Sequence, residues 1–193
     1  LFIKLSIDSI PPSLLTFYRL FIASIFLLFF CNIKKILRVK GKQLIYFLCI
    51  AIFGNVLPFN IISYSEKYVD SIVAATLIGT MPLFTFILSM FMSENKKPNI
   101  FGFFGVSVGF VGMLIFINPL KLNLVSYSLH ASILIILSAF FYGVSANIVK
   151  RIFGFSALEI ATYSTVIATI ISLPVLILNF YHYDHSVIEV LKT

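Results

Sequence analysis

The sequence predicts an all-α, polytopic membrane protein, because of its composition and the length of its apolar runs. Hydrophobic residues make up 60% of the 193 residues and charged residues only 11%, and the mean hydropathy is +1.08. In a soluble domain roughly a quarter of the residues are charged. The apolar runs are also too long and too numerous for one soluble core, so we expect lipid to surround most side chains.

Apolar runs close to the length of about 20 residues that crosses a bilayer are the next feature of the sequence. They lie at 13–32, 43–64, 69–92, 99–118, 130–149 and 156–180. The short apolar segment 1–7 resembles the end of one more helix, so we expect the chain to be truncated there. Lipid offers no hydrogen-bond partner to exposed backbone groups, so a spanning segment must be a helix or part of a closed barrel. These runs lack the alternation of polar and apolar residues that is typical of a barrel strand. We therefore expect each run to be a helix.

Basic residues are concentrated in alternate connections between these runs. Three connections, at 33–42, 93–98 and 150–155, hold nine Lys and Arg residues. The other connections mix Lys with acidic residues such as Glu66 and Asp70. Lys and Arg near span ends favour the cytoplasmic side, so we expect the three basic connections to be cytoplasmic. The net charge of +7 is thus explained by topology, and we expect no nucleic-acid partner.

When the segment 1–7 is counted as the first span, an internal repeat relates the second span, 13–32, to the seventh, 156–180. When one is shifted onto the other, Tyr18 aligns with Tyr163 and Ala23 with Ala168. The repeat would then contain five helices, and because five is odd the two copies would insert oppositely. We expect two inverted five-helix repeats, at 1–118 and 130–193, with the second one incomplete. Inverted repeats are common in secondary transporters, which bind their solute near the bilayer midplane.

Residues 54–88 carry a resemblance to a known family. They form two helices joined by a short acidic turn, with a proline in each, and the residues that carry the resemblance are Pro58, Phe59, Tyr68, Ser71, Pro82 and Leu83. With this order and spacing, the chain resembles the EamA-type family of the drug/metabolite transporter superfamily. The resemblance implies ten helices, of which the start of the first and the eighth to tenth are absent here. It also implies transport of small organic metabolites by alternating access.

Polar residues inside the third span are candidates for a solute pathway, because they are costly in lipid unless they face protein or water. Asn60, Ser63 and Tyr64 share one helical face, and Asn55 lies one turn earlier. Pro58 must remove one backbone hydrogen bond, so we expect a hinge there. The alternative is that these residues only join helices by hydrogen bonds.

The fourth and sixth spans hold further candidates. Thr76 and Thr80 share a face, and Gly79 with Pro82 predicts a bent or interrupted helix. The alternative is that the threonine hydroxyls bond to their own helix. In the sixth span the predicted polar stripe consists of Ser138, Tyr142 and Ser145. Within that stripe Tyr142 is our first choice for a lining residue.

Three features near or within the spans have a structural interpretation. We expect Arg19 to snorkel or to pair with Asp8, and the alternative is that it binds a substrate anion. Glu159 suits the start of a helix, with proton coupling as the alternative. The glycines of the fifth span, which we expect to allow close helix packing, are Gly102, Gly105, Gly109 and Gly112.

No constellation typical of an enzyme is present in the sequence. His130, His182 and His185 do not have the spacing of a zinc site, and no phosphate-binding or nucleophile motif occurs. We expect no enzyme activity, no metal and no cofactor, and transport driven by a gradient. The expected partners are the lipid bilayer, an unidentified small molecule and a possible second copy of the chain. The alternative is a truncated, non-transporting membrane protein that needs partner subunits.

The cellular location follows from composition. The chain has no Trp and is rich in Ile, Phe, Lys and Asn, which is typical of AT-rich genomes. We therefore expect a bacterial inner membrane.

Overall fold

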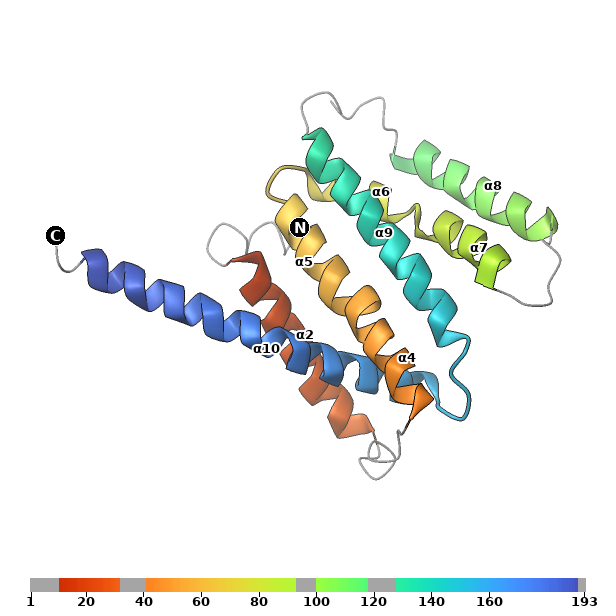
Figure 1. The fold of residues 1–193 in the computed structure, drawn as a ribbon. Helices are drawn as coiled ribbons and strands as arrows, with labels where there is room; N and C mark the ends of the chain where they lie inside the picture. Colours follow the sequence, from red (N-terminus) through yellow and green to blue (C-terminus); the bar gives the residue numbers. More distant parts are fainter. Residues whose placement is uncertain (1–10, 32–40, 93–99, 118–127, 191–193) are drawn as a thin grey trace.

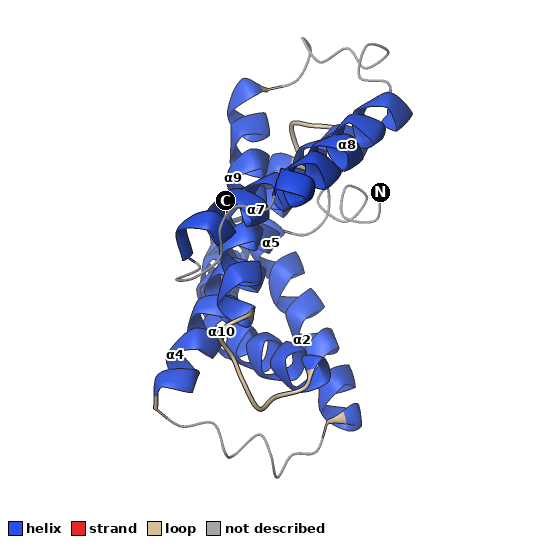
Figure 2. Ribbon diagram, turned by 90° about the vertical axis from the view of Figure 1, so that its right-hand side faces the viewer, coloured by secondary structure: helices blue, strands red, loops and turns tan. Residues whose placement is uncertain are grey.

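The computed structural model describes residues 11–31, 41–92, 100–117 and 128–190, and no strand occurs in these ranges (Figures 1 and 2). Five stretches within them are long and apolar enough to cross a membrane. These stretches are Pro12–Phe30, Gln43–Ser65, Ser71–Met92, Leu129–Val149 and Ala157–Pro174. The prediction of an all-α, polytopic membrane protein is confirmed.

Two of the five stretches are built from more than one helical segment. In chain order the elements are α2 (Pro12–Phe30), α4 (Lys42–Ala51), η1 (Ile52–Val56), α5 (Leu57–Ser65), α6 (Ser71–Ile78), α7 (Met81–Met92), α8 (Ile100–Ile117), α9 (Leu129–Val149) and α10 (Ala157–Val190). The third span is therefore α4, η1 and α5, and the fourth is α6 and α7.

The helices agree with the expected spans except at the two ends of the chain. Helix α8 is apolar along its 18 residues, in agreement with the expected span 99–118. The last helix, α10, continues to Val190 and so extends past the expected end at residue 180. The expected helix end at 1–7 lies outside the described residues.

Helix α9 is the centre of the arrangement. It lies between α5 and α7 in Figure 1, and it packs against both interrupted spans. Helix α8 flanks α7 on the outside, while α2 and α10 cross each other on the opposite side of α4 and α5.

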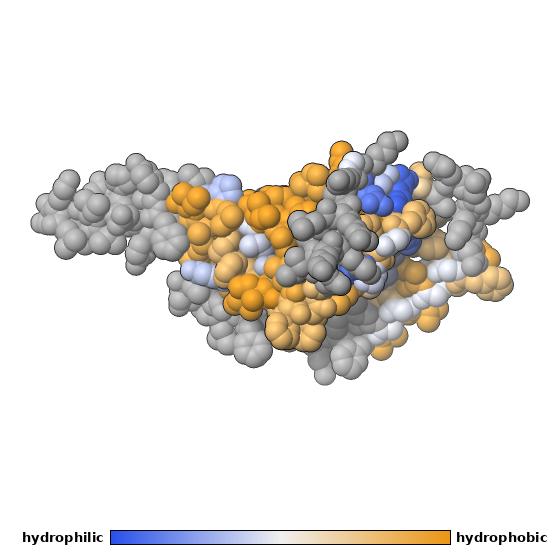
Figure 3. Space-filling model, turned by 90° about the horizontal axis from the view of Figure 1, so that it is seen from below, coloured by the Kyte–Doolittle hydropathy of each residue, from blue (hydrophilic) through white to orange (hydrophobic). Residues whose placement is uncertain are grey.

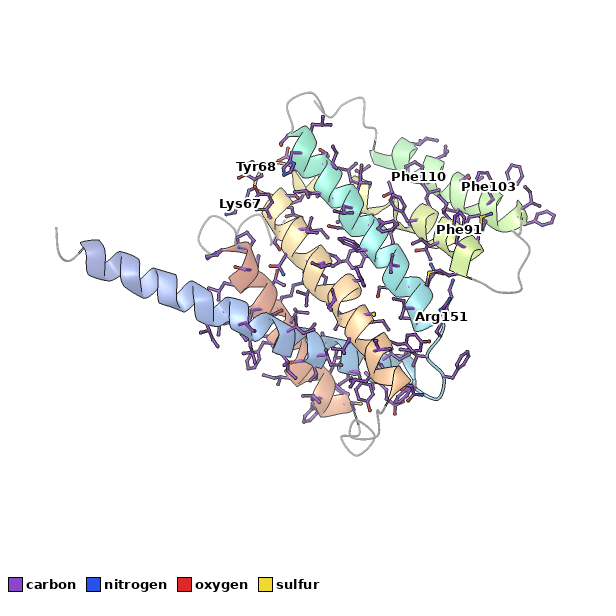
Figure 4. The ribbon with its side chains drawn as sticks, in the orientation of Figure 1. Lys67, Tyr68, Phe91, Phe103, Phe110 and Arg151 are labelled. Atoms are coloured by element: carbon purple, nitrogen blue, oxygen red, sulfur yellow. The ribbon has the colours of Figure 1, made fainter. Side chains whose placement is uncertain are left out.

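Two apolar clusters mark opposite ends of the helices. One contains Phe47, Ile148 and Tyr163, with Met92 packed against it, and so gathers the ends of the spans that adjoin the three basic connections. The other contains Val69, Val73, Ala74, Ala131 and Ile135, from the starts of α6 and α9. Lys67 and Arg151 accordingly lie at opposite ends of the bundle (Figure 4).

Large apolar side chains cover much of the described surface. Phe29, Phe91 and Phe101 are each more than four-fifths exposed, at 85%, 83% and 81%. Seen from below, the described surface is mainly hydrophobic, and its most hydrophilic residues form one patch (Figure 3). Exposing such an apolar surface is unfavourable in water and not in lipid, which agrees with a membrane environment.

Candidate solute pathway

The third span changes its hydrogen-bond pattern inside the membrane, directly before Pro58. Residues Ile52–Val56 form a π-helix, and the Leu57 N–H donates to the carbonyl of Ile52 five residues back. A proline lacks the N–H that the preceding turn needs, and one turn of π-helix is a common way to accommodate that loss. The irregularity expected at Pro58 is therefore present and lies just ahead of it.

Two amide side chains bond to carbonyl groups beside this irregularity. Asn60 Nδ2 donates to the Val56 carbonyl at 2.7 Å, and Asn55 Nδ2 donates to the Ile50 carbonyl at 3.5 Å. Both bonds stay within the third span. The two amides thus satisfy backbone groups at the break, which is a structural role.

The fourth span stops and restarts at residues 79 and 80. Helix α6 ends at Ile78, and α7 begins at Met81, so that Pro82 is its second residue. Proline is tolerated there because the first N–H groups of a helix have no partner within it. The interruption expected from Gly79 and Pro82 is present.

The two threonines near this interruption bond to their own helix. Thr80 Oγ1 donates to the Leu77 carbonyl at 2.6 Å, and Thr76 Oγ1 donates to the Ile72 carbonyl at 2.8 Å. This is the alternative that the sequence left open, and it leaves neither hydroxyl proton for a solute.

Helix α9 closely approaches both interrupted spans, at η1 in the third and at α7 in the fourth. A side chain on Gly54 in η1 would clash with the Ser145 hydroxyl. A side chain on Gly143 would come within 3.0 Å of Phe84 Cβ and 3.1 Å of the Thr85 nitrogen. The sequence did not single out Gly54 or Gly143 for close contact. No Cβ contact within 4 Å would arise at Gly105, Gly109 or Gly112, so the close packing expected there is not made by the described residues.

Of the predicted stripe on α9, two serines are buried and the tyrosine is not. Ser138 is fully buried and donates to the Leu134 carbonyl at 3.1 Å, and Ser145 packs at Gly54. Tyr142 is half-buried. Tyr142 therefore remains the member of the stripe that a solute could reach.

The three residues predicted to share a face of α5 have different surroundings. Ser63 is buried, and Tyr64 is 42% exposed. The Tyr64 ring lies 5.5 Å from the ring of Tyr68, near the end of the helix. Asn60, Ser63 and Tyr64 are therefore not brought together around one point.

Arg19 on α2 lies against α5 in a contact that the sequence did not predict. Its guanidinium carbon is 4.4 Å from the centre of the Phe59 ring. Arg19 is also within electrostatic range of Tyr142 on α9. Its expected partner Asp8 lies outside the described residues.

Among the described residues, the surroundings of Arg19 offset only part of the cost of placing its charge in the membrane. Arg19 lies roughly 10 Å along α2 from Pro12, at a rise of about 1.5 Å per residue, while half of the hydrocarbon core is about 15 Å. A central charge costs about 2.5–3.5 kcal/mol on insertion scales, and a cation–π contact returns about 0.5–2 kcal/mol. A wet or anionic environment would supply the rest.

Glu159 caps the first turn of α10. The Ser156 N–H donates to its Oε2 at 2.7 Å, and the Glu159 N–H donates to Ser156 Oγ at 3.3 Å. This reciprocal pair is a capping box, so the expected capping role is confirmed. In the part of the chain that the structure describes, no group of three His, Cys, Asp or Glu residues could hold a metal ion.

The comparison with known proteins decides the family. The model of the EamA-like transporter family matches residues 1–118. The chain belongs to this family. The five stretches of the described residues that are long and apolar enough to cross a membrane agree with a membrane transporter family.

Curated relatives agree with the family. The chain is 29% identical over 151 residues to an uncharacterized transporter, YoaV, of Bacillus subtilis, covering 77% of this chain and 51% of the relative. It is 38% identical over 105 residues to an uncharacterized transporter encoded in the trpA 3' region of Buchnera aphidicola subsp. Schlechtendalia chinensis, covering 54% and 34%. The chain thus spans about half the length of its relatives, or less. No solved structure matches it.

Proposed function

We propose that this EamA-like chain forms part of a gradient-driven permease that moves a small organic metabolite by alternating access between two inverted repeats. The observation that carries the proposal is the interruption of two consecutive spans inside the membrane, at η1 and at residues 79–80. Secondary transporters commonly form their solute site from discontinuous helices near the midplane. A break also gives each span a place to bend during rocking.

The family match over 1–118 supports the first repeat of the proposal. Residues 130–193 would begin the second, so α2 and α10 would be equivalent helices. These two helices pack against each other extensively. A contact between equivalent helices is what a repeat interface would contain.

The candidate residues divide into lining and bending roles. Tyr142 would line the pathway, and Tyr64 would lie nearer its outer end. The buried Ser63 would lie behind these two side chains. Pro58 and Pro82 would permit the bends. The residues that would hold the backbone or neighbouring helices in one of the two states are Asn55, Asn60, Thr76, Thr80, Ser138 and Ser145.

The proposed location is a bacterial inner membrane with the connections 33–42, 93–98 and 150–155 in the cytoplasm. Arg151 supports this orientation, because its Nη2 atom donates to the Met92 carbonyl at 2.8 Å and so keeps two of the three basic connections at one end. Lys and Arg at one end of the spans favour the cytoplasmic side.

Metabolite profiling of a bacterial host, with and without the chain, tests the proposed function. We expect a small set of organic solutes to change in concentration across the membrane, and an uncoupler to abolish the change. In membrane vesicles, Tyr142→Ala should slow the movement of the same solute at least several-fold, while the exposed Phe153→Ala should not. Movement that is unchanged by the uncoupler would contradict gradient drive. Movement only after co-expression of another subunit would favour the alternative of a non-transporting chain that needs partners.

A further inference from the structure

We infer that Arg19 and Phe59 form a binding site for the carboxylate group of an apolar organic anion. The inference rests on the proposed function and names the substrate class of that pathway. The two side chains come from α2 and α5, which are different spans, and they meet at 4.4 Å from guanidinium carbon to ring centre. Their contact is therefore a property of the fold and not of either helix alone.

The Arg19 guanidinium has its face on the Phe59 ring, and no residue in the described ranges occupies its donors. Its described contact is the one with Phe59, at 4.4 Å from guanidinium carbon to ring centre. Within the described ranges it makes neither a hydrogen bond nor an ion pair. A guanidinium that stacks on a ring still presents its N–H groups at its edge, where they match both oxygens of a carboxylate.

Three carboxylates whose side chains the structure describes have other partners. Glu159 is held by the capping box at the opposite end of the bundle, and Glu66 accepts from Ser71 Oγ at 3.2 Å. Asp70 also has an interaction of its own. A cation in a span needs an anion or water, and a solute anion fits the open side of Arg19, which is exposed.

A second polar group near Arg19 lacks a partner. Thr16 lies one turn before Arg19 on α2, is 1% exposed, and its Oγ1 atom makes no hydrogen bond. Most buried hydroxyl groups are paired, so an unpaired one beside a cation indicates that a polar species belongs nearby. Many threonines in spans bond to their own helix, as Thr76 does here at 2.8 Å, but Thr16 does not.

The Phe59 ring determines which anions the site would prefer. Phe59 packs with the cluster of Leu20, Ala51 and Ala168, so its ring is fixed from behind. Phe59 is nevertheless only half-buried. An anion with a flat apolar body would lie against the unburied part of the Phe59 ring while its carboxylate met Arg19, whereas a strongly hydrated anion such as phosphate would gain nothing from the ring.

Equilibrium binding of radiolabelled benzoate to the purified chain in lipid nanodiscs tests the inference, with benzamide as a ligand of the same shape and no charge. We expect saturable benzoate binding that excess unlabelled benzoate displaces and benzamide does not. Arg19→Gln should weaken the binding at least about tenfold, because it removes the charge-assisted hydrogen bonds. Arg19→Lys should recover only part of the lost affinity, because lysine keeps the charge but lacks the planar pair of N–H donors that binds both carboxylate oxygens. Phe59→Leu should weaken binding several-fold.

Matched controls separate the site from general effects of charge and folding. Arg151→Gln removes an arginine at the inner end of the bundle and should leave benzoate affinity unchanged. Each variant should elute as the wild type does in size-exclusion chromatography and melt within a few degrees of it. Equal binding of benzoate and benzamide, no binding of benzoate, or full affinity in Arg19→Gln would overturn the inference. Binding that appears only in Asp8→Asn would also overturn it, since Asp8 would then be the partner of Arg19.

The outcome is independent of the test of the proposed function. The binding experiment uses no gradient, so benzoate that binds through Arg19 without any solute being moved would leave the inference standing and contradict the permease. Gradient-driven movement of neutral solutes that Arg19→Gln does not affect would support the permease and contradict the inference.

Discussion

The Asn147 side chain on α9 donates a hydrogen bond of 3.0 Å to the backbone carbonyl of Thr85 on α7. The same amide donates to the Gly143 carbonyl at 2.9 Å, and its oxygen accepts from Lys150 Nζ at 3.3 Å. A side chain on Gly143 would meet Phe84 and Thr85, so the amide joins α7 and α9 beside a close contact between them. The α7 part of the fourth span is thereby fixed to the central helix.

Asn147→Ala should therefore destabilise the chain. Asn147 is 4% exposed, and breaking a buried hydrogen-bond pair costs about 1–3 kcal/mol. We expect a lower melting temperature in detergent, measured by circular dichroism at 222 nm. The matched control is Thr76→Val, which removes an exposed hydroxyl that bonds to its own helix. Equal melting temperatures for Asn147→Ala and the wild type would show that the interhelical bond contributes nothing.

Gly143→Val should be more damaging than the alanine substitution at Asn147. The added Cβ would lie 3.0 Å from Phe84 Cβ and 3.1 Å from the Thr85 nitrogen, and backbone cannot turn away as a side chain can. Inserting extra carbon atoms into a well-packed contact costs about 1–3 kcal/mol. We expect reduced yield of folded protein and a lower melting temperature.

Gly105→Ala is the control for that substitution. The new Cβ would have nothing within 4 Å, and alanine is a better helix former than glycine by up to about 1 kcal/mol. We expect unchanged or slightly raised stability. If both glycine variants lower the melting temperature alike, the close contact of Gly143 with α7 would not be the cause of the loss.

These glycines also show what sequence reasoning can and cannot reach. Proline chemistry is local, so Pro58 and Pro82 predicted the two breaks correctly. Close approach between helices depends on the partner helix, so the glycines spaced along α8 suggested packing that the described residues do not make, while Gly54 and Gly143 stand alone in their helices and gave no signal. For the same reason the sequence could not pair Arg19 with Phe59, because these residues come from different spans.

Pro58→Ala should straighten the third span. The new N–H could donate to a carbonyl of the preceding turn, so the π-helix at 52–56 could convert to α-helix. Hydrogen–deuterium exchange measured by mass spectrometry should then slow across residues 52–58. Pro82→Ala is the matched control, because the second residue of α7 needs no N–H partner within the helix. Unchanged exchange in Pro58→Ala would mean that other packing, such as Gly54 against Ser145, maintains the π-helix.

Cysteine labelling tests which side of the membrane each end of the bundle faces. In a variant with Cys31 and Cys49 replaced by alanine, single cysteines at Lys67 and Phe153 would report the two ends, since both positions are exposed. A membrane-impermeant maleimide added to intact spheroplasts should label Lys67→Cys, and should label Phe153→Cys only after permeabilisation. The physical reason is that the basic connections resist translocation. Both reporters lie in one chain, at opposite ends of the bundle. The reverse labelling pattern would therefore mean that the orientation is inverted while the fold is unchanged. Labelling of both positions from outside would mean that the chain inserts in two orientations.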